Sequence, residues 1–169
     1  LILESVGEGI FGLDLGGKVT FLNPMAEELL GYSFEELKDQ PIHLMIHHSK
    51  ADGTPYPIED CPIYHSFRDG EVYSGADEVY WRKDESSLPV DFTSTPIYEE
   101  GMLTGAVVVF KDISEYKRAD EVLKQIVVGT SAATGDEFLK SLVKNLATSL
   151  RVKYAFIGEF KGDQLEKAS

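Results

Sequence analysis

The sequence contains little cysteine and few basic residues, and it has no long apolar run. The single cysteine, Cys61, excludes an internal disulfide and a multi-cysteine zinc site. Lys and Arg total 16 against 29 Asp and Glu, and the net charge of −13 disfavours nucleic acid and anionic lipid as partners. No apolar run reaches the length of a membrane span, and Glu4 stands where a secretory signal needs basic residues. These absences predict a cytoplasmic protein, or the cytoplasmic part of a larger one.

What is present fits a folded domain with a small appendage. The 169 residues are 43% hydrophobic and 27% charged, which is typical of a chain that buries a core. Residues 9–22 show two short strand patterns around a glycine-rich turn, so they predict a β-hairpin. Asn23 and Pro24 predict the N-cap and first residue of a helix. Ser33 and Glu36 have the capping-box spacing of a second one.

The middle of the chain predicts short helices followed by three strands. Four prolines interrupt residues 40–69, which leaves room for a helix over residues 62–69. Residues 72–83, 88–98 and 103–111 are rich in Val, Tyr, Phe and Thr and are separated by turns. The last of these runs is apolar on both faces, so we expect it to be a central strand.

A helix is expected to follow this strand directly. Tyr116, Ala119, Leu123 and Ile126 are spaced three, four and three residues apart, as in a short coiled coil. The helix either pairs with a second copy or packs on its own domain. After a linker of small residues, an amphipathic helix and a strand over residues 152–160 are expected. These two elements cannot bury their apolar faces alone, so they belong to a second domain or are covered by a partner chain.

Two long segments resemble a PAS domain. NPMAEELLGYSFEEL, residues 23–37, is similar to the part of that family in which an Asn opens the first helix and a Gly-Tyr pair precedes the second. WRKDESSLPVDFTSTPIYEEGMLTGAVVVFKDIS, residues 81–114, resembles its second half, with Glu85 in place of the turn Gly and Ser114 in place of the closing Thr. DEFLKSLVKNLATSLRVKYAFIGEF, residues 136–160, resembles the opening helix and first strand of a GAF domain.

The resemblance implies an α+β fold with a five-stranded antiparallel sheet, short helices on one face, a linker helix and a partial GAF-like segment. The expected domains are residues 1–114, 115–129 and 130–169. It implies a sensory module that binds a small ligand or partner and signals through its C-terminal helix to an effector such as a histidine kinase or diguanylate cyclase. The alternative is a ligand-free dimerisation and relay module. Either way a homodimer through the linker helix is expected, and the chain carries no catalytic constellation of its own.

The family's closing Asp-Ile-Thr marks the joint between the last strand and the signalling helix, which here is Asp112, Ile113 and Ser114. A carboxylate at this position accepts helix N–H groups and attracts a cation from a neighbouring strand, for which Arg82 or Lys83 is the candidate. We hypothesise that Asp112 locks the joint. The alternative is that Asp112 only caps the helix.

A ligand pocket would be lined by inward residues of the strands and helices, and it predicts a small, apolar or aromatic ligand. The candidates are Phe11, Leu22, Leu30, Leu44, His65, Phe67, Trp81, Phe92 and Val108. The alternative is that these side chains fill the core completely.

Heme and flavin are not expected, and the cofactor is left unknown. The flavin-bonding Asn-Cys-Arg-Phe-Leu-Gln signature is absent, and the acids beside Cys61 should not lower its pKa, so a packed thiol is expected. No histidine matches the position of the heme ligand in the family. His43, His47 and His48 lack a carboxylate at regular spacing, so no metal site is predicted.

Overall fold

The computed structural model describes residues 7–130, 136–149 and 156. The chain divides into two compact units, Leu1–Glu115 and Tyr116–Ser169, and each is described by itself. The described residues include no helix long and apolar enough to cross a membrane.

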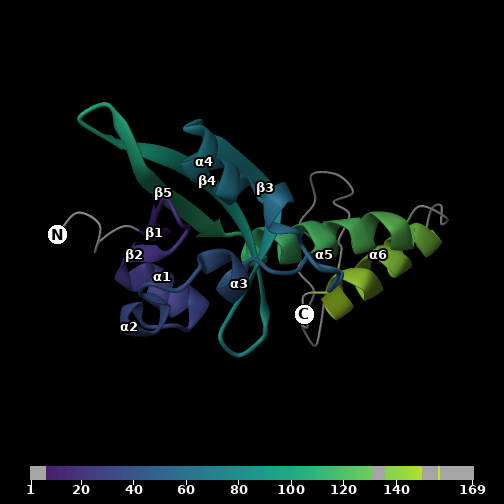
Figure 1. Ribbon diagram of the computed structural model, residues 1–169. Helices are drawn as coiled ribbons and strands as arrows, with labels where there is room; N and C mark the ends of the chain where they lie inside the picture. The colour runs from purple at the N-terminus through teal and green to yellow at the C-terminus, as the bar shows by residue number, and fades with distance from the viewer. Residues whose placement is uncertain (1–6, 131–135, 150–155, 157–169) are drawn as a thin grey trace. The chain divides into compact units, whose positions relative to one another are not determined.

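The first unit is built on a five-stranded antiparallel sheet, which confirms the predicted fold class (Figure 1). The strands lie in the order β2-β1-β5-β4-β3, so the apolar last strand is central, as its two buried faces predicted. Their bounds are β1 Gly9–Asp14, β2 Val19–Leu22, β3 Tyr73–Trp81, β4 Ser87–Glu99 and β5 Met102–Asp112.

Short helical elements connect the hairpin β1–β2 to β3. They are α1 Pro24–Leu30, α2 Phe34–Leu37, α3 Ile42–Ile46, the 3-10 turn η1 Ile58–Asp60 and α4 Pro62–Asp69. The core lies between these helices and the sheet, where Leu30 and Ile46 from the helices pack with Phe11, Val90 and Phe110 from the strands. All five side chains are at most 1% exposed, so the helices and the sheet share one continuous core.

Side-chain caps set the positions of the first two helices. The Asn23 side chain accepts a hydrogen bond from the backbone of Ala26, and α1 ends at Gly31 in the left-handed conformation. The predicted capping box of Ser33 and Glu36 is present at α2. Local sequence therefore fixes both helices before any packing is considered.

A β-bulge in β3 turns one side chain toward the core. Gly75 pairs with Phe92 and Glu78 pairs with Val90, so β3 has one residue more than β4 between these pairs. Asp77 within the bulge has a φ of 60°, and its N–H donates to the Asp91 carboxylate at 2.9 Å. The extra residue reverses the alternation of the strand, so Glu78 lies opposite a core residue.

The second unit contains the linker helix and the start of the predicted appendage. Helix α5 spans Ser114–Thr130 and helix α6 spans Asp136–Ser149, in agreement with the two predicted helices. Tyr116 and Leu123 of the predicted heptad pattern are 73% and 62% exposed in the single chain. The strand expected over residues 152–160 falls outside the described residues except for Phe156, and the GAF-like assignment stays a prediction.

Candidate functional site

The joint between β5 and α5 has no loop, and Asp112 holds it together. Oδ1 of Asp112 accepts a hydrogen bond from the Ser114 backbone N–H at 2.7 Å, which caps the new helix. The N–H of Ile113 donates to the Pro89 carbonyl of β4 at 3.0 Å. Two short hydrogen bonds thus tie the start of the helix to the ends of strands β5 and β4.

Arg82, directly after β3, is the cation that faces this joint. Its guanidinium lies 3.9 Å from Oδ2 of Asp112, and the two side chains are 27% and 31% exposed. Its Nε donates to the Leu29 carbonyl of α1 at 2.8 Å, and Nη1 donates to the Ser87 carbonyl at 3.0 Å. Arg82 therefore connects helix α1, the β3–β4 turn and the joint through one side chain.

Most of the predicted pocket residues fill the core instead of lining a cavity. Phe11, Leu22, Leu30, Phe92 and Val108 are all buried in one cluster. Aromatic rings pack closely within it, and the ring centroids of Phe11 and Phe110 lie 5.9 Å apart. This arrangement corresponds to the alternative of a filled core.

Three of the predicted pocket residues lie elsewhere. Leu44 is 64% exposed, because it lies on the side of α3 opposite Ile42 and Ile46. His65 is partly exposed, and its Nδ1 lies 3.3 Å from the carboxylate of Asp69 on the same helix.

Trp81 faces a surface groove rather than the core. Its indole N–H donates to the Ser49 carbonyl at 2.9 Å, and its ring stacks on His48 at a centroid distance of 6.0 Å. The indole therefore holds the loop after α3 against the end of β3.

A small cavity of about 20 Å³ lies between α3, α4 and the β1–β2 turn. Of the predicted pocket residues, only Phe67 lines it. Its other lining residues are Gly16, Gly17, Pro41, Ile42, His43, Ile46, His47, Ile58, Cys61, Ile63 and Tyr64. A volume of this size accommodates about one water molecule or one ion, and not an aromatic ligand.

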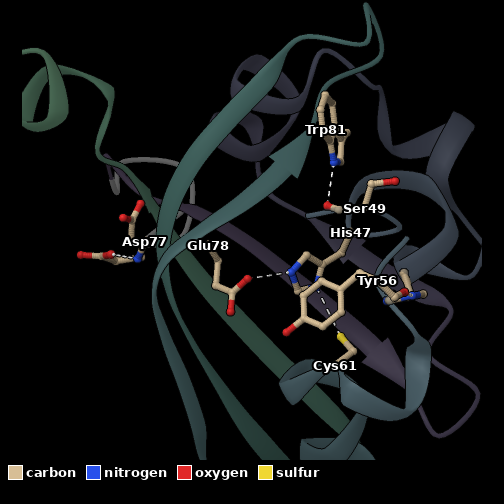
Figure 2. A network of polar contacts seen from close by, with 9 residues as sticks. His47, Ser49, Tyr56, Cys61, Asp77, Glu78 and Trp81 are labelled. Atoms are coloured by element: carbon tan, nitrogen blue, oxygen red, sulfur yellow. Dashed lines mark hydrogen bonds and ion pairs between the residues drawn. The ribbon is translucent and has the colours of Figure 1, made fainter. Parts of the chain in front are cut away.

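Two histidines and the cysteine meet at this cavity. Sγ of Cys61 lies 3.3 Å from Nδ1 of His47, and one ligand atom from each of His43, His47 and Cys61 lies within 4.8 Å of the others. Nε2 of His47 lies 3.4 Å from the Glu78 carboxylate. Figure 2 shows this contact and the one between His47 and Cys61. All three ligand residues are buried, at 7%, 1% and 1% exposure.

The electrostatics of this cluster favour a charged thiol and imidazole pair. Burial opposes the charge on His47, but its contacts with Cys61 and Glu78 outweigh burial and raise its pKa. Burial likewise raises the pKa of Cys61, but the imidazoles of His43 and His47 outweigh it and lower the pKa. The expectation that the surroundings of Cys61 would not lower its pKa is wrong, because the histidines lie closer to the sulfur than its sequence neighbours suggested.

The fold agrees with the comparisons to known proteins. A sequence model of the PAS domain matches residues 7–115. The chain belongs to the PAS domain family. Solved PAS domains of nitrogen regulation protein NR(II) from Vibrio parahaemolyticus and of a Colwellia psychrerythraea protein have the same fold, with TM-scores of 0.53 and 0.56. They share 23% and 24% sequence identity, and the matches cover 66% and 67% of this chain and 94% and 92% of theirs.

Two signalling proteins of Escherichia coli K12 are similar to this PAS chain. The probable diguanylate cyclase DgcE is 28% identical over 132 residues, which are 78% of this chain and 11% of DgcE. The signal transduction histidine-protein kinase AtoS is 26% identical over 155 residues, which are 89% of this chain and 24% of AtoS. The chain thus spans a minor part of either relative. It is a sensory PAS domain homologous to those of histidine kinases and diguanylate cyclases, and such a domain is regulatory rather than catalytic.

Sequence reasoning about this PAS domain missed the cluster around Cys61. His43 and His47 stand four residues apart, a spacing that places both on one side of α3, and this was the available signal. Cys61 joins them from the N-cap of α4, whereas His48 turns away to bond Ser49 at 2.7 Å. Glu78 comes from β3, and only the bulge directs it there, so no regular spacing marks it.

Proposed function

We propose that this chain is the sensory part of a longer signalling protein and that Asp112 relays changes in the PAS sheet to helix α5. The effector at the far end of the relay is an enzyme of the kind found in the relatives, a histidine kinase or a diguanylate cyclase. The joint carries this proposal, because Asp112 contacts both the start of α5 and Arg82, which follows strand β3. The cap satisfies an N–H group at the start of α5 with a carboxylate of strand β5, so a displacement of β5 acts on the helix directly.

The filled core favours the ligand-free form of this function over an organic ligand in the core. A ligand in the core would have to contact Phe11, Phe92 and Val108. These side chains are each at most 3% exposed and belong to one packed cluster. The 20 Å³ cavity beside them has room for about one water. We therefore propose that the domain relays signals from a neighbour or from a very small ligand, and an apolar or aromatic metabolite is the second candidate.

Dimerisation through α5 completes the proposed relay. Tyr116 and Leu123 are seven residues apart, which places them on the same side of the helix, and both are exposed. Pairing of this side with a second copy would bury them and would carry a change at the joint to both effector domains. The dimer is a proposal that rests on this exposed side of α5 and on the heptad spacing.

Replacing Asp112 with Ala in the full-length protein tests the relay. The loss of the cap and of the partly exposed ion pair should cost about 1–2 kcal/mol of unfolding free energy, so the domain should stay folded. We expect the output of the effector to change at least several-fold. Glu99→Ala removes the same charge from an exposed residue at the end of β4 and should leave the output unchanged.

The relay proposal fails if Asp112→Ala leaves effector output at the wild-type level while the circular dichroism spectrum shows a folded domain. Arg82→Ala separates the two contacts of Asp112. If it reproduces the Asp112 effect, the ion pair matters, and if it does not, the cap alone carries the signal.

A further inference from the structure

His43, His47 and Cys61 form a buried cluster whose geometry is compatible with metal binding as well as with simple core packing. One ligand atom from each lies within 4.8 Å of the others, and all three residues line the 20 Å³ cavity. Two imidazoles and a thiolate are the ligand types that zinc prefers in proteins. The three residues come from two separate elements, α3 with its C-cap and the N-cap of α4.

Nε2 of each imidazole, the ring nitrogen proposed to face away from the cluster, already has a hydrogen-bond acceptor. Nε2 of His43 donates to the Tyr56 carbonyl at 2.9 Å, and Nε2 of His47 lies 3.4 Å from the Glu78 carboxylate. An imidazole whose Nε2 carries the proton presents an unprotonated Nδ1. Metal-binding histidines are held in this way, with a carbonyl or carboxylate fixing the ring from behind.

The inner nitrogen of His43 is the observation that separates a metal site from a simple thiol–imidazole pair. Nδ1 of His43 is buried and has no hydrogen-bond partner among the described residues, although the residue is only 7% exposed. The direct contact between Cys61 and His47 does not involve this atom. A buried acceptor without a partner destabilises the fold, so a partner that binds there would recover this cost.

We propose that His43, His47 and Cys61 bind one Zn²⁺ ion through their two Nδ1 atoms and the sulfur, with a water in the fourth position. Tetrahedral bonds of about 2.0–2.3 Å place ligand atoms about 3.3–3.6 Å apart, and the existing Cys61–His47 distance is 3.3 Å. The His43 ligand atom lies within 4.8 Å of the other two, so it needs a shift of up to about 1.5 Å. The cavity has the volume that one water needs.

Glu78 would act as a positioning residue for this site. It touches His47 on the side away from the sulfur, so it orients the ring and makes Nδ1 a better donor to the metal. Loss of such a contact weakens metal binding by about 10–100-fold in comparable sites. The bulge in β3 turns Glu78 inward, so it would place the carboxylate that orients His47 for metal binding.

Cobalt titration of the metal-free chain tests the site directly, and the readout does not involve signalling. Co²⁺ substitutes for zinc in tetrahedral sites, and binding should produce one equivalent of a thiolate-to-cobalt charge-transfer band that Zn²⁺ then abolishes. Cys61 is the chain's only cysteine, so the band identifies its sulfur as a ligand. Zn²⁺ should also raise the melting temperature by several degrees.

Variants test the individual side chains of the site. Cys61→Ser should abolish the charge-transfer band, His43→Ala should weaken Co²⁺ binding at least tenfold, and Glu78→Gln should weaken it by about 10–100-fold. His48→Ala is the matched control, because His48 is next to the site in sequence but bonds Ser49, and it should bind Co²⁺ like the wild type.

The proposal is overturned if the wild-type chain shows no charge-transfer band, a result that requires no variant to fold. It is also overturned if His43→Ala binds Co²⁺ as tightly as the wild type, because His43 would then not be a ligand. The relay at Asp112 does not depend on either result.

Discussion

Asn23 should contribute more to stability than an ordinary helix cap. Its buried side chain accepts hydrogen bonds from the N–H groups of Ile10 at 2.8 Å and Ala26 at 2.9 Å, and it donates to the Glu8 carbonyl at 3.0 Å. Asn23→Ala removes all three bonds. The lost cap costs about 1 kcal/mol, and each group left unsatisfied on the β1 side costs about 1–3 kcal/mol. The Glu8 bond is only partly buried, so we expect a total loss of about 3–5 kcal/mol.

Urea unfolding followed by the fluorescence of Trp81, the only tryptophan, measures this loss within the first unit. Asn23→Ser is the matched variant, because its hydroxyl still caps α1 but is too short to bridge to Glu8, and it should fall between the wild type and the alanine variant. A loss of only about 1 kcal/mol for Asn23→Ala would refute the reasoning, since the cap alone accounts for that much.

Three further predictions concern packing, pH and assembly. Gly105→Ala should abolish stable folding as measured by circular dichroism, because the new Cβ would overlap the Leu13 carbonyl on β1. The hydrogen bond from Lys83 lowers the pKa of Glu36 from 4.5 to about 2, so its contribution to stability is present above pH 4.5 and is lost as the pH falls toward 2. Glu36→Gln should flatten stability over that range in acid unfolding curves. Leu123→Glu should shift sedimentation from dimer to monomer if α5 pairs with a second copy.

Local signals made most of the fold predictable from sequence. Asn23 followed by Pro24, and Ser33 followed by Glu36, mark helix starts through bonds that form within four residues. The strands were predictable for the same reason, since alternation and turn residues are local. The Arg82–Asp112 contact could be suggested only because the resemblance indicated which strand ends meet.

The cavity and its cluster were not predictable, because they depend on where short elements turn. Leu44 was placed inside, yet a helix as short as α3 buries only one side, and Ile42 and Ile46 take it. Cys61 stands 14 positions after His47, beyond a loop and the short turn η1, and Glu78 reaches His47 through a bulge. Neither the approach of Cys61 nor that of Glu78 follows a regular spacing that could be recognised in the sequence.

Strand β3 connects the cluster to the joint. Glu78 lies on it beside His47, and Arg82 follows its last residue and contacts Asp112. Four residues of extended chain span about 13 Å, and β4 pairs with this stretch of β3, so it moves as a paired strand. Coupling between two sites requires an element that both sites bias, and β3 is the element that both contact.

If the proposed metal site is the sensed site, Zn²⁺ should therefore change the hydrogen exchange of the Ile113 N–H, which bonds the Pro89 carbonyl at the joint. We expect a change of several-fold in the wild type and a smaller one in Arg82→Ala, which still binds the metal but lacks the contact to Asp112. An unchanged Ile113 rate at full zinc occupancy would mean that the metal only stabilises the fold. The joint would then respond to a neighbouring domain, and the cluster would explain the stability of the sensor rather than its signal.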